Sequence, residues 1–78
     1  MDEAIVTVYS KPACVQCAAT KRALDTKGIR YLEVNLTTNG AALEYVTEDL
    51  GYSQAPVVVA SDHNHWSGFR PDLINQLT

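Results

Sequence analysis

The sequence predicts one α/β domain, residues 1–78, in which three helices flank a mixed four-stranded sheet and the elements follow the order βαβαββα. Three observations predict this fold. The length of 78 residues suits one small domain, and no repeat, low-complexity stretch or linker divides it. Short β-branched runs alternate with segments of helical periodicity. The first three elements form a βαβ unit with parallel strands, and a later hairpin adds antiparallel strands.

The N-terminal part is predicted to form a strand, a helix and a second strand. Residues 4–9 are β-branched and mostly apolar, as in a central strand buried on both faces. Residues 10–13 form a loop. Residues 14–27 are predicted to be helical, because Cys17 and Leu24 are seven residues apart on one face and Gly28 is a stop signal. Residues 29–35 alternate and predict the second strand.

A second helix is predicted after the second strand. Thr37 or Thr38 is expected to cap its start, and Gly51 to close it. Its apolar stripe is predicted to consist of Leu43, Val46 and Leu50.

The C-terminal part is predicted to form a hairpin and a last helix. Residues 56–60 and 65–67 are the two strands, and residues 61–64 are the polar turn between them. Pro71 suits the first position of the last helix, whose inward residues are Leu73, Ile74 and Leu77. The complete order of elements indicates a thioredoxin-like architecture.

Composition narrows the function and the compartment. No stretch approaches the roughly 20 apolar residues that a membrane-spanning helix needs. The start, residues 1–3, is acidic where a secretory signal is basic, so a cytoplasmic protein is expected. A net charge of −3 argues against nucleic-acid binding. The basic residues nevertheless gather near the cysteines, either as solvated helix faces or as a cationic rim that steers an acidic partner: Lys11, Lys21, Arg22, Lys27 and Arg30.

Cys14 and Cys17 are the only cysteines and form a C-x-x-C at the junction of a strand and a helix. In a reducing cytosol such a pair is expected to cycle between dithiol and disulfide. A helix N-terminus favours the thiolate, so Cys14 is predicted to be the nucleophile. Cys17 lies one turn later, within disulfide reach but more shielded, and is predicted to be the resolving thiol. Lys11 either adds a favourable charge or is merely exposed.

The expected cycle has two exchanges and needs no bound cofactor. The Cys14 thiolate attacks a substrate disulfide, and Cys17 then resolves the mixed disulfide and leaves a Cys14–Cys17 disulfide. Within the predicted first strand, Thr7 is the only polar residue. The sequence therefore assigns no base to Cys17, and water is the default acceptor of its proton.

A metal carrier is the alternative of another class. A zinc site would combine both cysteines with His63 and His65, but the H-x-H spacing departs from the usual H-x3-5-H. The histidines are therefore predicted to be surface residues and no metal site is expected. A related alternative is a carrier in which thiolates from two chains hold an iron–sulfur cluster.

Three further residues are candidates for substrate or partner binding. Pro56 opens a strand, so it marks either a simple strand edge or a bend beside the dithiol. Trp66 and Phe69 flank a Ser-Gly pair just before the last helix. Aromatic residues at such positions serve either the core or a contact surface.

Three segments together resemble the NrdH-redoxin family of glutaredoxin-like proteins: residues 9–17 (YSKPACVQC), 54–58 (QAPVV) and 66–72 (WSGFRPD). The resemblance covers nearly the whole chain, and its last segment is the most specific. It implies a dithiol hydrogen donor for class Ib ribonucleotide reductase. It also implies that thioredoxin reductase, and not glutathione, recharges the protein with electrons from NADPH.

The resemblance also implies roles for individual residues. Ala55–Pro56 is expected to be a cis peptide that faces the dithiol and leaves Ala55 backbone groups to pair with an extended substrate. Residues 67–72 resemble a hydrogen-bonded block beside Trp66, where glutaredoxins bind glutathione with a Gly-Gly and an acidic residue. That pattern is missing here. The missing pattern favours a protein reductant, and a glutathione-dependent glutaredoxin is the second redox alternative. The protein is expected to be a weakly associating monomer.

Overall fold

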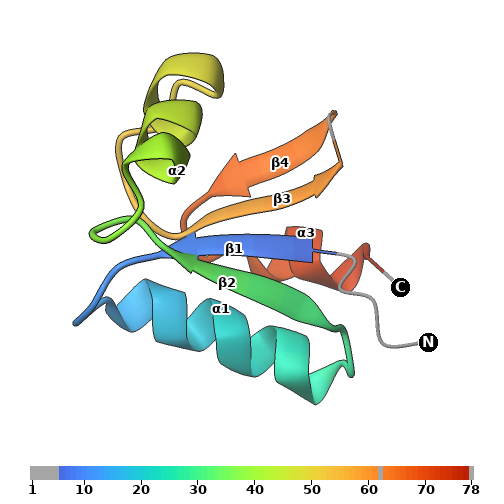
Figure 1. Cartoon of the computed structure of the whole chain (residues 1–78). Coiled ribbons are helices and arrows are strands. Elements are labelled where there is room, and N and C mark those ends of the chain that lie inside the picture. The colour runs from blue at the N-terminus through green and yellow to red at the C-terminus, as the bar shows by residue number, and fades with distance from the viewer. Residues whose placement is uncertain (1–5, 62, 78) are drawn as a thin grey trace.

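The computed structural model describes residues 6–61 and 63–77 and confirms the predicted fold class. Its sheet has the strand order β2-β1-β3-β4, in which β1 runs parallel to β2 and antiparallel to β3, and β3 runs antiparallel to β4 (Figure 1). In chain order the elements are β1 (Val6–Ser10), α1 (Val15–Thr26), β2 (Tyr31–Asn35), α2 (Gly40–Glu44), the π-helical turn η1 (Tyr45–Asp49), β3 (Val57–Ser61), β4 (Asn64–Ser67) and α3 (Pro71–Asn75).

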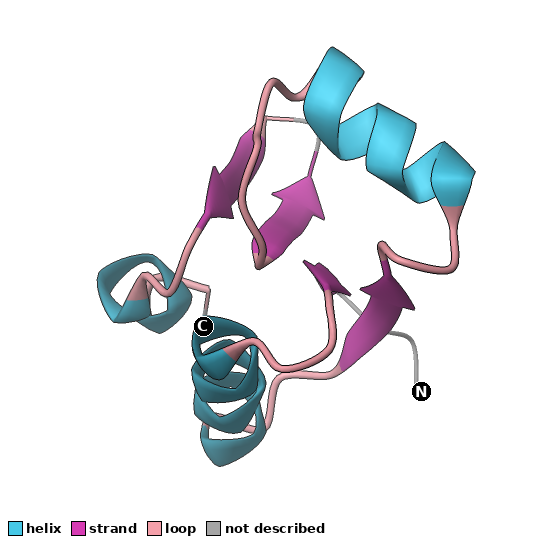
Figure 2. Ribbon diagram, turned by 90° about the vertical axis from the view of Figure 1, so that its left-hand side faces the viewer, coloured by secondary structure: helices cyan, strands magenta, loops and turns pink. Residues whose placement is uncertain are grey.

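The sheet lies between two helical layers. α1 and α3 cover one face, and α2 with η1 covers the other (Figure 2). On the second face, Tyr9 of β1 packs against Tyr45 of η1 with ring centroids 5.8 Å apart. β1 is a central strand, as predicted, because it lies between β2 and β3.

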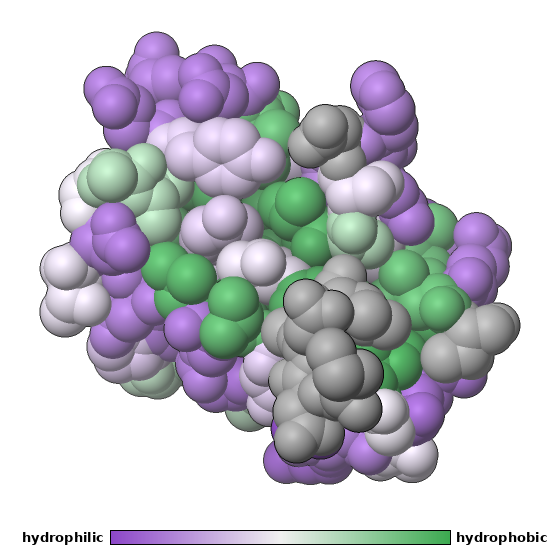
Figure 3. All heavy atoms as spheres, turned by 45° about the vertical axis from the view of Figure 1, so that its right-hand side comes forward, coloured by the Kyte–Doolittle hydropathy of each residue, from purple (hydrophilic) through white to green (hydrophobic). Residues whose placement is uncertain are grey.

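The main core lies between the sheet and the layer of α1 and α3. In β1 every second residue is buried, because alternate side chains of a strand point to opposite faces. Burying such side chains is the main force that holds a small domain together. Figure 3 shows hydrophobic side chains in the middle of one face and hydrophilic ones mostly along its margin. The core cluster consists of Val6, Val8, Leu24, Ile29, Val58, Trp66 and Ile74.

The N-terminal elements follow the prediction with small shifts. β1 extends through Ser10, one residue beyond the predicted strand, and residues 4 and 5 of that prediction lie outside the described residues. α1 begins after Cys14, which is its N-cap. Cys17 and Leu24 both face the core, and Gly28, with a φ of 72°, follows the helix end as predicted.

The second helix differs most from its prediction. Asn39 caps it by accepting the N–H of Ala42 at 3.0 Å, whereas Thr37 and Thr38 lie in a turn that is hydrogen-bonded to Asn35. The predicted threonine cap is therefore wrong. Of the predicted apolar stripe, Val46 is buried as expected and Leu50 is partly buried, but Leu43 is 45% exposed and Ala42 is the buried residue in its place. The wider π-helical turn of η1 changes the phase of the helix after Glu44.

The C-terminal elements carry a tighter hairpin than predicted. Ser61 and Asn64 pair with each other, so they belong to the strands and not to a turn of residues 61–64. Asp62 of that predicted turn lies outside the described residues. α3 begins at Pro71, as predicted. Its Ile74 is buried, and Leu73 and Leu77 are partly buried against the same core.

Candidate active site

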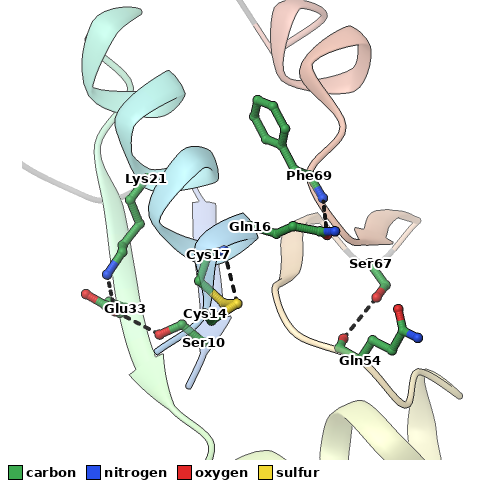
Figure 4. The surroundings of a disulfide bond; sticks show 9 residues. All are labelled: Ser10, Cys14, Gln16, Cys17, Lys21, Glu33, Gln54, Ser67 and Phe69. Atoms are coloured by element: carbon green, nitrogen blue, oxygen red, sulfur yellow. Dashed lines mark hydrogen bonds and ion pairs between the residues drawn. A yellow bond between two sulfur atoms is a disulfide. The ribbon is translucent and has the colours of Figure 1, made fainter. Parts of the chain in front are cut away.

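Cys14 and Cys17 form a disulfide at the start of α1 (Figure 4). Their Cα atoms are 5.2 Å apart, a normal separation for a bridged pair. Cys14 has the extended backbone of an N-cap residue, and its sulfur accepts a hydrogen bond from the backbone N–H of Cys17 at 3.1 Å. The sulfur of Cys14 therefore occupies the position where a capping side chain satisfies the first N–H groups of a helix.

The two sulfurs differ in exposure. The Cys17 side chain faces the core and only 2% of the residue is exposed, whereas Cys14 is partly exposed at the junction of β1 and α1. In the dithiol state, the N–H groups and the positive helix end favour the thiolate of Cys14. The geometry therefore supports attack by Cys14 and resolution by Cys17.

One flank of the disulfide opens into a hollow of about 350 Å³, here called the charged hollow. Both cysteines line it together with side chains from β1, α1 and β2. Within it, the Glu33 carboxylate accepts a hydrogen bond from the Ser10 hydroxyl at 2.8 Å and pairs with the Lys21 ammonium at 2.7 Å (Figure 4). The hydrogen bond from Lys21, followed by the one from Ser10, lowers the pKa of Glu33. The same Lys21–Glu33 hydrogen bond raises the pKa of Lys21.

Sequence reasoning identified Lys21 only as one of the basic residues near the cysteines, and it missed Ser10 and Glu33. Ser10 is buried on the same face as Val6 and Val8, so the polar side chain of β1 on the side of α1 is Ser10. Thr7 belongs to the alternate set of β1 residues with Tyr9, on the side of η1. Glu33 arrives from the neighbouring strand, where the parallel register pairs it with Val8. The sequence signal that could have revealed Ser10 and Glu33 was the alternation of buried residues in β1, combined with the parallel pairing of β1 and β2.

The other flank is a rim of three chain segments, here called the latched rim: residues 54–56, residues 67–69 and Gln16. The peptide bond between Ala55 and Pro56 is cis, as the family resemblance implies. Three hydrogen bonds tie the segments together, and two of them appear in Figure 4. They run from the Gly68 N–H to the Pro56 carbonyl (2.7 Å), from the Ser67 hydroxyl to the Gln54 carbonyl (2.9 Å) and from the Phe69 N–H to the Gln16 side-chain oxygen (3.2 Å).

The structure brings some predicted partner residues together. Lys11 is exposed and lines the charged hollow, and it also lines a second, mainly apolar hollow of about 230 Å³ together with Ala55. Phe69 is 37% exposed beside Gln16. Gln16 itself was not singled out from the sequence, because nothing in a C-x-x-C indicates a contact 53 residues away.

Trp66 was a candidate for partner binding, with a core position as the alternative. The structure places it in the core, with 4% of its surface exposed. β4 turns Trp66 inward opposite Val58, because alternate residues of the strand face the layer of α1 and α3. A side chain so deeply buried offers almost no area to a partner, so Trp66 supports the rim from behind.

The histidines do not join the cysteines. His65 is partly buried, with its Nδ1 2.8 Å from the hydroxyl of Tyr52, which also donates to the His65 carbonyl. In the described residues, no three side chains of His, Cys, Asp or Glu are grouped so as to hold a metal. None of the described helices has the length and hydropathy needed to cross a membrane.

A bridged C-x-x-C at a helix start, on a sheet of order β2-β1-β3-β4, defines a thiol–disulfide oxidoreductase of the thioredoxin-like fold. Comparison with known proteins specifies this class. The Glutaredoxin family model matches residues 6–66. The chain belongs to this family and, within it, to the NrdH-redoxins.

The similar proteins support that assignment over almost the full chain. The glutaredoxin-like protein NrdH of Escherichia coli K12 is 44% identical over 72 residues, which are 92% of this chain and 86% of that protein. NrdH of Lactococcus lactis is 38% identical over 94% of this chain and 99% of its own length. The solved NrdH-redoxin of E. coli, a protein with a thioredoxin-like activity profile, superposes with a TM-score of 0.87 over 94% of this chain and 93% of that one.

Proposed function

We propose that this protein carries electrons from thioredoxin reductase, which draws them from NADPH, to the disulfide of a class Ib ribonucleotide reductase. It acts in the cytoplasm as a monomer, and the Cys14–Cys17 pair is its only redox group. The family resemblance implies these partners, and the E. coli relative has the thioredoxin-like activity profile that such a route requires.

The observation that carries this proposal is that residues 67–69 are already hydrogen-bonded to other parts of the protein. In glutaredoxins this region binds glutathione. Here, hydrogen bonds to Gln54, Pro56 and Gln16 already use the Ser67 hydroxyl, the Gly68 N–H and the Phe69 N–H. Arg70 and Asp72 are paired with each other through two hydrogen bonds. Glutathione would have to compete with these contacts, whereas a protein reductase can reach the partly exposed Cys14 without breaking them.

The proposed cycle moves two electrons and balances its protons. The Cys14 thiolate attacks one sulfur of the ribonucleotide reductase disulfide. A mixed disulfide forms, and the other substrate sulfur leaves as a thiolate that takes a proton from water. Cys17 loses its proton to solvent and attacks Cys14, so that the second substrate sulfur leaves as a thiolate and is protonated. Thioredoxin reductase then reduces the Cys14–Cys17 disulfide by the same two exchanges in reverse.

The latched rim is the proposed docking surface for both partners. Ala55 is partly exposed directly before Pro56, and its backbone is proposed to pair with an extended segment of the partner. Lys11, which lines a hollow together with Ala55, and Phe69, which is 37% exposed, are proposed to contact the same segment. Trp66 and Pro56 are buried and hold these residues in place.

Turnover with two electron sources tests the proposal. The oxidised protein is supplied either with thioredoxin reductase and NADPH or with glutathione, glutathione reductase and NADPH, and insulin disulfide reduction is followed in both. We expect rapid turnover with the first source and near-background turnover with the second. Efficient turnover with glutathione would overturn the assignment in favour of a glutaredoxin. Nucleotide reduction by a purified class Ib enzyme then tests the final acceptor, with Cys14→Ser as the inactive control.

A further inference from the structure

The charged hollow provides a route from solvent to the shielded sulfur. Cys17 is 2% exposed, yet it lines this hollow together with Cys14. The resolving step needs the proton of Cys17 to leave before the sulfur can attack. The charged groups that line the hollow therefore share it with the residue whose ionisation controls that step.

Three charged residues line the hollow, and they come from three different segments. Lys11 comes from the loop before α1, Lys21 from α1 and Glu33 from β2, while Ser10 and Asn35 are neutral. Lys21 lies four residues after Cys17 and hence on the same side of the helix. The Lys21 and Glu33 side chains are 29% and 43% exposed, so solvent screens their charges only in part.

We propose that the Lys21–Glu33 pair sets the acidity of the resolving thiol: Lys21 favours the thiolate of Cys17, and Glu33 opposes it. Ser10 holds the Glu33 carboxylate against the wall of the hollow through its 2.8 Å hydrogen bond. Lys21 and Glu33 thus act on the ionisation of Cys17 and do not themselves touch the substrate. The proposal depends on the C-x-x-C chemistry and not on which reductase or acceptor the protein serves.

The difference between ordinary thiol and carboxyl pKa values argues against a simpler role for Glu33 as the base that takes the proton of Cys17. An ordinary thiol has a pKa of about 8.5 and an ordinary Glu about 4.3, so proton transfer between them is unfavourable by a factor of about 10⁴. The contacts with Lys21 and Ser10 lower the pKa of Glu33 further and widen that gap. Water is therefore the better proton acceptor, and Lys21 and Glu33 act on Cys17 through their electric field.

In the step affected, the Cys17 thiol gives its proton to water and its thiolate attacks the Cys14 sulfur of the mixed disulfide. The bond between Cys14 and the substrate breaks, and the substrate thiolate leaves and is protonated. At neutral pH, lowering the pKa of Cys17 by half a unit raises its thiolate fraction about threefold. Nucleophilicity falls as the pKa falls, with a Brønsted slope of about 0.4–0.5, so the net gain in rate is about twofold.

Titration of Cys17 by itself tests the proposal directly. In a Cys14→Ser background Cys17 is the only thiol of the chain, and its thiolate is measured by absorbance at 240 nm against pH. We expect Glu33→Gln to lower the pKa of Cys17 and Lys21→Met to raise it, each by about half a unit to one unit. Adding both substitutions should return the pKa close to that of the background.

The matched controls are Arg22→Met and Glu48→Gln in the same background. Each removes one charge of the same sign from outside the residues that line the charged hollow. We expect them to shift the pKa of Cys17 by no more than about 0.2 unit, with unchanged circular dichroism in all variants. Shifts of the same sign for Glu33→Gln and Lys21→Met, or shifts no larger than the controls, would overturn the proposal. No partner protein is present, so the outcome does not depend on the proposed function.

A rate measurement provides the second readout. In proteins that keep both cysteines, stopped-flow release of thiol from a Cys14 mixed disulfide at pH 7 reports the resolving step. Glu33→Gln should speed this release about twofold and Lys21→Met should slow it about twofold. Equal rates in the two variants would contradict the proposed opposition of the two charges even if the titrations differed.

Discussion

The two flanks of the disulfide are built from different kinds of contact. The latched rim depends on uncharged groups, namely backbone N–H and carbonyl groups together with the Ser67 hydroxyl and the Gln16 side-chain oxygen. The charged hollow depends on ionised side chains held by a hydroxyl. Hydrogen bonds between uncharged groups hold the shape of the rim and carry no net charge, whereas ionised groups act on a nearby thiol through their charge. Recognition and thiol acidity should therefore be separable by mutation.

The sulfurs shared by both flanks should show the largest effect. Cys14→Ser should reduce disulfide turnover by at least about a hundredfold, because a hydroxyl does not replace the thiolate that attacks the substrate. The insulin assay with thioredoxin reductase measures this loss.

Cys17→Ser is the matched control for Cys14→Ser. It keeps the attacking sulfur and should accumulate a mixed disulfide that is visible by mass spectrometry. Equal accumulation in Cys14→Ser would reverse the assigned roles of the two cysteines.

A defect in the backbone of the latched rim should come next in size. Gly68 has a φ of 87°, so Gly68→Ala forces a side chain into the left-handed region and should cost about 1–2 kcal/mol in the free energy of unfolding. The added Cβ would lie 3.5 Å from the Gln16 side-chain oxygen, an ordinary contact, so the cost arises from the backbone. Urea denaturation of the oxidised protein measures it.

Gly40→Ala is the control for that substitution. Gly40 lies in α2 outside the left-handed region and has open space around its added Cβ. It should leave the free energy of unfolding unchanged or raise it slightly. A loss of similar size at both glycines would show that the cost at residue 68 does not arise from its left-handed backbone.

Loss of the Gln16 contact should have a smaller effect that separates the two flanks. Gln16→Ala frees the Phe69 N–H and should raise the KM for the protein partner about fivefold, as expected for a hydrogen bond worth about 1 kcal/mol. The turnover number should change little. Steady-state kinetics with thioredoxin reductase measures both constants.

Val15→Ala is the neighbouring control, since Val15 is 84% exposed and is part of the same C-x-x-C. The pKa of Cys17 should be the same with Gln16→Ala as without it. A shift in that pKa would show that the latched rim also controls thiol acidity and would end the separation of the two flanks.

The ion pair of the charged hollow should have the smallest effect on stability. The pKa of Glu33 is lower in the folded protein, chiefly through the hydrogen bond with Lys21, so the pair stabilises the fold above the ordinary Glu pKa of about 4.3. That contribution is lost as the pH falls through the lower folded pKa. Because both side chains are partly exposed, Glu33→Gln should cost less than about 1 kcal/mol at pH 7.

The measurement is urea denaturation of the parent and Glu33→Gln at pH 7 and at decreasing pH below 4.5. The difference between the two proteins should shrink as the pH falls and should also shrink in 1 M salt. A difference that grows toward acid pH would have the wrong sign for a lowered pKa.

Much of this protein is determined by local sequence. The C-x-x-C, the glycine after α1 and Pro71 at the start of α3 follow from short-range rules on helix ends, and the structure confirms their positions. The order of elements and the fold class follow from periodicity and connection rules, and they are confirmed too. Local patterns succeeded less well where several residues compete for one role, as at the start of α2, where Asn39 and not a threonine caps the helix.

Only the tertiary structure decided the surroundings of the sulfurs. Glu33 reaches Ser10 because β1 and β2 pair in a particular parallel register. Gln16 reaches Phe69 because the start of α1 lies beside the segment before α3 (Figure 4). Trp66 points inward for the same reason, since pairing with β3 sets which face of β4 is buried. The sequence alone determined the dithiol and the fold, because these depend on neighbours along the chain, whereas contacts between distant segments depend on register and packing.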